Sequence, residues 1–150
     1  MPWRVTAHFL VPDNGPMIST ELAAKLRDAG LVWSPADGDQ FRIAAPELAG
    51  DVFTVSTMTI EAHEFPTGTI LGFNGTTEWA LDSVAIEDAL WLPREDQLRT
   101  LLRSGFRALR RVDGAYEVEV ELLGHPRVFA DPEPTDAYGR ALLALIELSR

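Results

Sequence analysis

The feature that most constrains the fold is the Asn74-Gly75 dipeptide, which stands between two apolar runs, Thr69–Phe73 and Thr76–Val84. Asn and Gly both tolerate the positive φ angles of a type I′ turn, so this pair is the strongest short-range signal of a β-hairpin. A two-residue loop also fixes the register of the strands that it joins. The cross-strand pairs that it predicts are Phe73 with Thr76, Leu71 with Glu78, and Ile70 with Trp79.

Polar and aromatic side chains gather around this hairpin, so we expect it to carry a binding surface. Trp79 and Leu81 share the face expected to be the core side, while Glu78 and Asp82 lie on the opposite face. A tryptophan beside amide and hydroxyl groups is typical of an interaction hot spot. The candidate binding residues are Asn74, Thr76, Thr77, Glu78, Trp79 and Asp82, joined by His63, Trp91 and Arg94.

The two carboxylates of this surface do not make a general acid–base pair, and we expect no catalytic residue. Glu78 and Asp82 lie four residues apart on one strand, which separates them by about 13 Å. Glycosidase carboxylate pairs stand only about 5–9.5 Å apart. An alternative hypothesis joins them with His63, or with Glu87 and Asp88, in a ligand-binding or metal-binding enzyme-like site. A solvated acidic rim is the simpler interpretation.

Composition and missing motifs exclude several classes of enzyme. The 150 residues include no cysteine, which excludes disulfides, thiolate catalysis and zinc–thiolate sites. The three histidines, His8, His63 and His125, are scattered and form no metal-binding motif. The sequence has no P-loop, no GxGxxG and no GxSxG motif. We therefore expect no metal and no cofactor.

The charge pattern indicates an acidic protein with one cationic island. The formal net charge is −10, which disfavours binding to duplex nucleic acid. Residues 94–111 run against this trend, because they hold six arginines and two acids. Arginine suits phosphate recognition, but pairing with the protein's own acids is the favoured interpretation of the island. The acidic remainder motivates another alternative, a nucleic-acid mimic or a regulator of a nucleic-acid enzyme.

No stretch of the sequence predicts a membrane helix. The longest apolar stretch is Ala141–Ile146, whereas a membrane helix needs about 20 apolar residues. The N-terminus lacks the apolar region of a signal peptide, so we expect a cytoplasmic protein with no membrane contact. Met17 is an alternative to Met1 as the start, which would make residues 1–16 an N-terminal extension.

Three helices are expected. Ser19 and Gly30 have the chemistry to begin and end the first. Arg94–Ser104 and Thr135–Leu148 form the other two, and residues 85–91 are expected to hold a further helical turn. The last helix is apolar nearly all round, which favours either deep packing or a homodimer contact.

A second hairpin is predicted at Asp113-Gly114, where pairing sets Arg110 opposite Glu117. Strands and helices do not alternate in the way that builds a parallel sheet. The expected fold is therefore α+β, a single domain with antiparallel meanders in two hairpin groups and three helices.

Three stretches resemble a known family: Ile18–Trp33, Gly72–Val84 and Ala89–Leu98. They are similar to a family of small, uncharacterised bacterial proteins, some of which carry the automatic label pilus assembly protein. The resemblance covers roughly residues 17–148 and implies no established activity. Because the sequence holds no complete catalytic set, we expect a non-enzymatic accessory module that binds an unidentified protein partner.

Overall fold

The computed structural model of the chain describes residues 4–7, 17–43, 52–56, 63–65, 68–73, 76–81 and 89–149. The length of the sequence predicts a single domain. In the structure, the chain divides into two compact units. Unit 1 comprises Met1–Pro12 and Trp33–Trp91, and unit 2 comprises Asp13–Val32 and Leu92–Arg150. In the described ranges, all three α-helices belong to unit 2.

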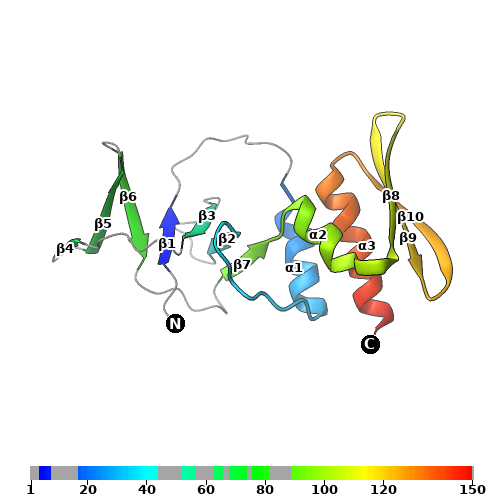
Figure 1. The fold of residues 1–150 in the computed structure, drawn as a ribbon, viewed down its shortest axis with the longest axis horizontal. Helices are drawn as coiled ribbons and strands as arrows, with labels where there is room; N and C mark the ends of the chain where they lie inside the picture. The colour runs from blue at the N-terminus through cyan, green and yellow to red at the C-terminus, as the bar shows by residue number, and fades with distance from the viewer. Residues whose placement is uncertain are drawn as a thin grey trace. The chain divides into compact units, whose positions relative to one another are not determined.

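Seven short strands form one sheet: β1 (Arg4–Ala7), β2 (Gln40–Ile43), β3 (Phe53–Ser56), β4 (His63–Phe65), β5 (Gly68–Phe73), β6 (Thr76–Leu81) and β7 (Ala89–Leu92). The last residue of β7, Leu92, belongs to unit 2. Their order in the sheet is β4-β5-β6-β1-β3-β2-β7 (Figure 1). Every pair whose register is described is antiparallel. The Asn-Gly hairpin forms here as β5 and β6, and its three predicted cross-strand pairs are confirmed.

An aromatic cluster forms the core of unit 1. The ring centroids of Trp33 and Phe41 lie 5.3 Å apart, and those of Phe41 and Phe53 lie 5.7 Å apart. Trp91 stacks on Trp33 at 6.4 Å with 10° between the ring planes. The buried carboxylate of Asp39 accepts a hydrogen bond of 3.0 Å from the indole N–H of Trp33. This bond satisfies the indole and offsets part of the cost of burying the carboxylate.

The helical turn expected over residues 85–91 is wrong for the part that the structure describes. Ala89–Leu92 is strand β7, which is hydrogen-bonded to β2, and residues 85–88 lie outside the described ranges. A single helical turn is costly to nucleate because it fixes several dihedrals for one hydrogen bond. A neighbouring strand supplies backbone partners at less cost, and Ala89 and Leu92 are both buried.

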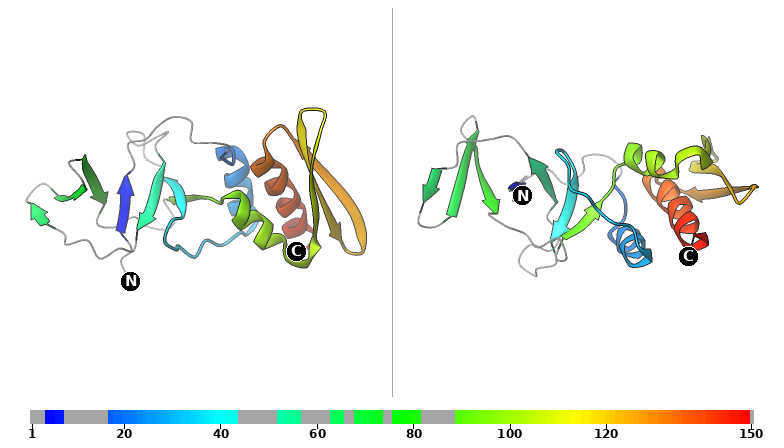
Figure 2. Two further views of the ribbon diagram at one scale, coloured as in Figure 1. Left: turned by 45° about the horizontal axis from the view of Figure 1, so that its top comes forward. Right: turned by 60° about the horizontal axis from the view of Figure 1, so that its bottom comes forward.

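Unit 2 combines helices α1 (Thr20–Ala29), α2 (Glu95–Leu102) and α3 (Pro134–Leu148), a 3₁₀ turn η3 (Arg103–Gly105), and strands β8 (Phe106–Val112), β9 (Ala115–Leu122) and β10 (His125–Asp131). Helix α3 packs against the strands on one side and against α1 and α2 on the other (Figures 1 and 2). The strand order is β10-β9-β8, so β8 and β10 are both edge strands. The fold class is therefore α+β with antiparallel strands, as predicted.

The predicted signals at the ends of α1 are confirmed. Ser19 is the N-cap, and Gly30 ends the helix with a left-handed φ of 117°. Helix α2 begins one residue later than expected because Arg94 is its N-cap. The main-chain N–H of Arg94 donates to Oε1 of Gln97 at 2.9 Å. Residues 103–105 continue as the 3₁₀ turn rather than as α-helix.

The second predicted hairpin is confirmed as β8 and β9, with Arg110 opposite Glu117. One face of β9 carries the buried residues Val118, Val120 and Leu122, and this face packs against α3. The glutamates between them point the other way, as expected for a strand with one wet face. Helix α3 thus covers one face of the unit 2 sheet, and the glutamates of β9 lie on the other face.

Candidate functional site

The hairpin candidates lie on β6, in unit 1. Asn74 and Asp82 lie outside the described residues. The other four candidates are the first four residues of β6: Thr76, Thr77, Glu78 and Trp79. Binding by this hairpin stays a prediction, since the structure describes only its backbone.

The position of His63 relative to the hairpin follows from the register. His63 on β4 lies opposite Ile70, which lies opposite Trp79. Glu78 pairs with Leu71 in the adjoining row. Positions in successive rows alternate between the two faces of a sheet. The His63 and Glu78 positions therefore occupy opposite faces.

The two remaining candidates, Trp91 and Arg94, lie away from the hairpin along the chain and have structural partners. Trp91 is on β7, and strands β1, β3 and β2 separate β7 from β6. At a strand spacing of 4.7–4.9 Å, this separation is about 19 Å. Trp91 instead packs against the aromatic core of unit 1. Arg94 caps α2 in unit 2.

A groove in unit 2 brings together residues that are far apart in the sequence. It lies between α1, β10 and α3 and has a volume of about 390 Å³. Its apolar lining consists of Leu22, Phe129, Leu143 and Ala144. Its charged lining consists of Glu21, Lys25, Arg127, Asp136, Arg140 and Glu147. The groove therefore pairs an apolar surface with charges of both signs.

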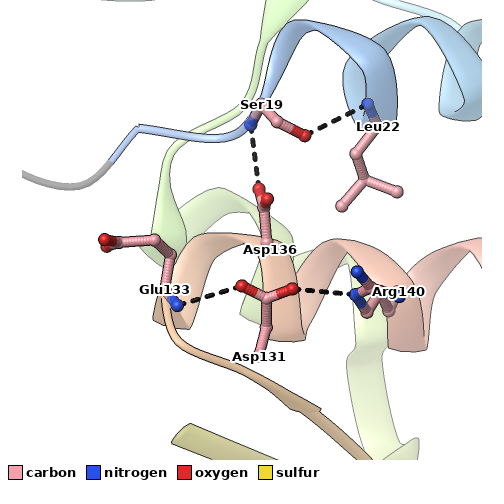
Figure 3. Close-up of polar contacts among 6 residues, drawn as sticks. All are labelled: Ser19, Leu22, Asp131, Glu133, Asp136 and Arg140. Carbon is pink, nitrogen blue, oxygen red and sulfur yellow. Dashed lines mark hydrogen bonds and ion pairs between the residues drawn. The ribbon is translucent and has the colours of Figure 1, made fainter. Parts of the chain in front are cut away.

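A hydrogen bond between residues 117 positions apart joins the first turns of the two helices. The main-chain N–H of Ser19 donates to Oδ1 of Asp136 at 2.8 Å (Figure 3). The hydroxyl of Ser19 in turn accepts from the main-chain N–H of Leu22 at 3.3 Å. Asp136 lies in the first turn of α3, where a carboxylate interacts favourably with the helix dipole. Both helix starts are thereby held at one end of the groove.

Gly139 allows α1 and α3 to approach each other. A Cβ atom at this position would lie 2.6 Å from Cδ2 of Leu22 and 3.2 Å from Cδ1 of Ile18. Glycine inside a helix costs roughly 0.5–1 kcal/mol relative to alanine. The close packing of the buried Leu22 and Ile18 side chains offsets this cost, since burying one such side chain contributes about 1.5–3 kcal/mol.

Asp131 links the end of β10 to α3 through hydrogen bonds and an ion pair. Its Oδ1 accepts from the main-chain N–H of Glu133 at 3.0 Å, and its Oδ2 accepts from Nε of Arg140 at 3.0 Å (Figure 3). The side chain of Asp131 is only 11% exposed, so this ion pair is better shielded from water than a surface pair. The charge of Arg140 is therefore already matched within the chain.

Four other charges of the groove have no ionic partner within the described part of the chain. Lys25 and Arg127 form no ion pair there, and neither do Glu21 and Glu147. The guanidinium carbon of Arg127 lies 5.4 Å from the ring centroid of Phe129, a cation–π contact that leaves its charge free to attract an anion. These four side chains are available to a partner that enters the groove.

The turn between β9 and β10 carries an exposed leucine in an unfavourable conformation. Leu123 has a φ of 52° and is 77% exposed. The left-handed conformation costs most L-residues about 1–2 kcal/mol, and a bulky residue there is an outlier. The β8–β9 turn has the same φ angles, 49° at Asp113 and 79° at Gly114, against 52° and 79° in the β9–β10 turn. Aspartate, unlike leucine, is a common residue in that conformation.

The arginines of residues 94–111 are partly neutralised by the protein's own acids, as the favoured interpretation predicts. Three of the six form ion pairs with neighbouring carboxylates: Arg94 with Asp96 at 3.3 Å, Arg107 with Glu121, and Arg110 with Glu119 at 2.7 Å. These pairs are largely exposed, so each contributes only about 0.2–1 kcal/mol.

One buried hydroxyl of unit 2 has a shifted pKa. Burial raises the pKa of the Tyr138 hydroxyl above its ordinary value, and the charge of the neighbouring Arg99 opposes this shift. Tyr138 is therefore protonated at neutral pH. No group of three or more His, Cys, Asp or Glu side chains within the described ranges could hold a metal ion. None of the helices there is long and apolar enough to cross a membrane.

Comparisons with protein-family models, with curated proteins and with solved structures each gave no match. The family resemblance of the sequence thus stays a prediction.

The sequence patterns did not predict the groove or the exposed Leu123. Two signals were available. Gly139 stands inside an otherwise apolar helix, which indicates a close approach of another element. Leu123 precedes a glycine between two strands, which places a leucine where Asn or Asp is usual.

Proposed function

We propose that the chain is a non-enzymatic accessory module that binds another protein chain through the groove of unit 2. The observation that carries this proposal is a partly apolar groove in which the charges of Glu21, Lys25, Arg127 and Glu147 have no ionic partner in the described part of the chain. Such a groove fits a protein segment that presents an apolar side chain beside charges opposite to those of the lining. A cytoplasmic location belongs to the same proposal, supported by a cysteine-free sequence that suits a reducing compartment.

The energetics require an interface wider than the groove. One leucine-sized side chain buried in the groove contributes about 1.5–3 kcal/mol, and each exposed ion pair adds about 0.2–1 kcal/mol. Association costs at least about 4 kcal/mol in lost translational and rotational freedom. We therefore expect the partner to cover the neighbouring surface as well, with the groove as the anchor point.

Capture of partners by groove variants tests this proposal. Ala144→Arg places a long charged side chain in the groove, and Ala130→Arg adds the same side chain at an exposed position of β10 outside the groove lining. Tagged wild type and both variants are purified from the native host, and the bound proteins, including untagged copies of the chain itself, are identified by intact-mass spectrometry. The wild type and Ala130→Arg should retain a stoichiometric partner that Ala144→Arg loses.

The proposal fails if Ala144→Arg, shown to be folded by circular dichroism, retains the same proteins as the wild type. It also fails if the purified protein turns over a metabolite, because a binding module has no substrate. Thermal-shift screening with metabolites and divalent cations supplies candidates for that second test. A ligand at 100 times its dissociation constant should stabilise the protein by about 2.7 kcal/mol.

A second candidate function rests on the charge of unit 1. Unit 1 has two arginines against ten carboxylates, a formal net charge of −8, whereas unit 2 has a net charge of −2. A strongly acidic unit favours a basic partner, such as a nucleic-acid enzyme that the module regulates. Recovery of such a partner should fall steeply as salt is raised, because the Debye length shrinks from about 30 Å at 0.01 M to 3 Å at 1 M. Recovery that is independent of salt would exclude this candidate.

A further inference from the structure

We propose that Leu123 of one copy of the chain occupies the groove of a second copy, so that two copies pair reciprocally. This inference rests on the proposed function and deepens it, because it names the protein chain that enters the groove. Leu123 and the groove both belong to unit 2. The pairing therefore depends on the fold of unit 2 alone.

The first argument is that Leu123 in the free chain has both an exposed apolar side chain and an unfavourable backbone conformation. Its side chain is 77% exposed, and its backbone has a φ of 52°, which leucine disfavours. Asp113 shows that the same sheet uses an ordinary turn residue where only a turn is needed. Residues in sparsely populated backbone conformations cluster at functional sites, where other interactions compensate for the strain. Burial of Leu123 in another chain supplies that compensation.

The second argument is the chemistry of the groove. Leu22, Phe129 and Leu143 give it an apolar surface on which a branched aliphatic side chain can be buried. Within one chain, Leu123 remains exposed to solvent. A matching knob and hole on the same unit are the elements of a self-complementary contact.

The third argument is charge complementarity between the surface around Leu123 and the rim of the groove. The 3₁₀ turn beside Leu123 packs on the end of β9, since a Cβ atom at Gly105 would lie 3.1 Å from the carbonyl oxygen of Glu121. Arg103 in this turn is exposed and forms no ion pair in the described part of the chain. Glu147 in the groove is likewise exposed and unpaired there. When Leu123 enters the groove, Arg103 brings the opposite charge toward Glu147.

Reciprocal exchange closes the assembly at two copies. In a two-fold pair each copy gives one Leu123 and receives one, so no knob and no groove remains free. Helix α3 supplies Leu143, Ala144 and Glu147 to the contact. The homodimer expected from the apolar last helix would thus use the face of α3 that borders the groove.

Cysteine cross-linking between two different variants tests the contact. The chain has no cysteine, so introduced thiols have no competitors. Leu123→Cys protein mixed with Ala144→Cys protein should form a disulfide that joins one chain of each kind, identified by its mass and by loss on reduction. Asp113→Cys, at the equivalent position of the other turn, is the matched control and should not cross-link with Ala144→Cys. Equal cross-linking of both turn variants, or none with Leu123→Cys, overturns the proposal.

Light scattering after gel filtration provides the second measurement. The wild type should approach the mass of a dimer as its concentration rises, and Leu123→Asn should dissociate about tenfold or more readily. Asparagine suits the turn, so this variant should remain folded in circular dichroism. A wild type that is monomeric at every concentration, or a Leu123→Asn variant that dimerises equally well, overturns the proposal. If the wild type is monomeric and Ala144→Arg still loses a host partner, the proposed function stands and only the self-pairing fails.

Discussion

The two turns of the β8–β10 sheet have nearly the same backbone and differ in the residue at their first position. Asp113 and Leu123 have φ angles of 49° and 52°, and the glycine after each has a φ of 79°. Aspartate is favoured in this conformation and needs no further explanation. Leucine gains nothing from the turn and leaves an apolar side chain in water. The difference teaches that the turn geometry does not account for leucine at position 123, which motivates the proposed contact with a second chain.

The largest expected change in stability comes from substituting the glycine of each turn, and it tests whether the backbones of the two turns are equivalent. Gly114→Ala and Gly124→Ala each add a methyl group at a φ of 79°, and neither new Cβ would meet an atom within 4 Å. The cost is therefore conformational alone, and each variant should lose about 1–2 kcal/mol of unfolding free energy. Urea denaturation followed by circular dichroism measures both. Losses that differ by more than the fitting error would break the comparison of the two turns.

An exchange of the first residues sharpens the comparison. Leu123→Asn should raise the free energy of unfolding by about 1 kcal/mol, because asparagine tolerates the left-handed conformation, and Asp113→Leu should lower it by a similar amount. For a unit of this size, 1 kcal/mol shifts the melting temperature by about 4–8 °C. Thermal melts of dilute samples measure both changes in the monomer.

A Leu123→Asn variant that melts below the wild type in dilute solution would show that Leu123 stabilises its own chain. Asp113→Leu also serves as a control for association. It creates a second exposed leucine in an equivalent turn, and it should not raise the tendency to dimerise through the groove.

The hairpins of the chain show which parts of the fold the sequence could predict. Asn74-Gly75 and Asp113-Gly114 are dipeptides whose chemistry matches their turns, so both registers follow from local rules. For the third turn the sequence predicts Gly124-His125, one residue later than the observed Leu123-Gly124 pair, because leucine is unusual at the first position of such a turn. Local signals locate a turn less accurately where its first residue does not favour the left-handed conformation.

The groove could not be predicted because its parts meet only through long-range packing. Ser19 and Asp136 are 117 residues apart and are joined by one hydrogen bond. Helical periodicity predicts which face of each helix is apolar, but it does not identify the helix that will cover that face. The helical turn predicted over residues 85–91 is wrong for a related reason, because strand β7 is hydrogen-bonded to its neighbour β2 in the sheet.

The smallest effect at neutral pH is expected at Tyr138, in the helix that supports the sheet of both turns. The pKa of its buried hydroxyl is raised above the unfolded value of about 10. The folded state thus favours the protonated form, and this contribution is present below pH ~10 and lost as the pH rises through the folded pKa. Tyr138→Phe should change stability at neutral pH by about 1 kcal/mol or less, because it removes only the hydroxyl and keeps the buried ring.

Thermal melts over a range of alkaline pH check this prediction. The wild type should lose stability above pH ~10, and Tyr138→Phe should lose less. An identical alkaline decline in both proteins would place the controlling ionisation elsewhere. The packing of α3 beneath the two turns would then be independent of Tyr138 ionisation.

The distribution of tryptophans and helices gives each of the two units its own spectroscopic signal. All four tryptophans of the sequence fall in unit 1, where Trp33 stacks on Trp91 and donates to the carboxylate of Asp39. The three described helices all fall in unit 2. Tryptophan emission therefore follows the melting of one unit, while helical circular dichroism follows the other. Superimposed curves from one unmodified sample would show that the two units unfold as a single cooperative body.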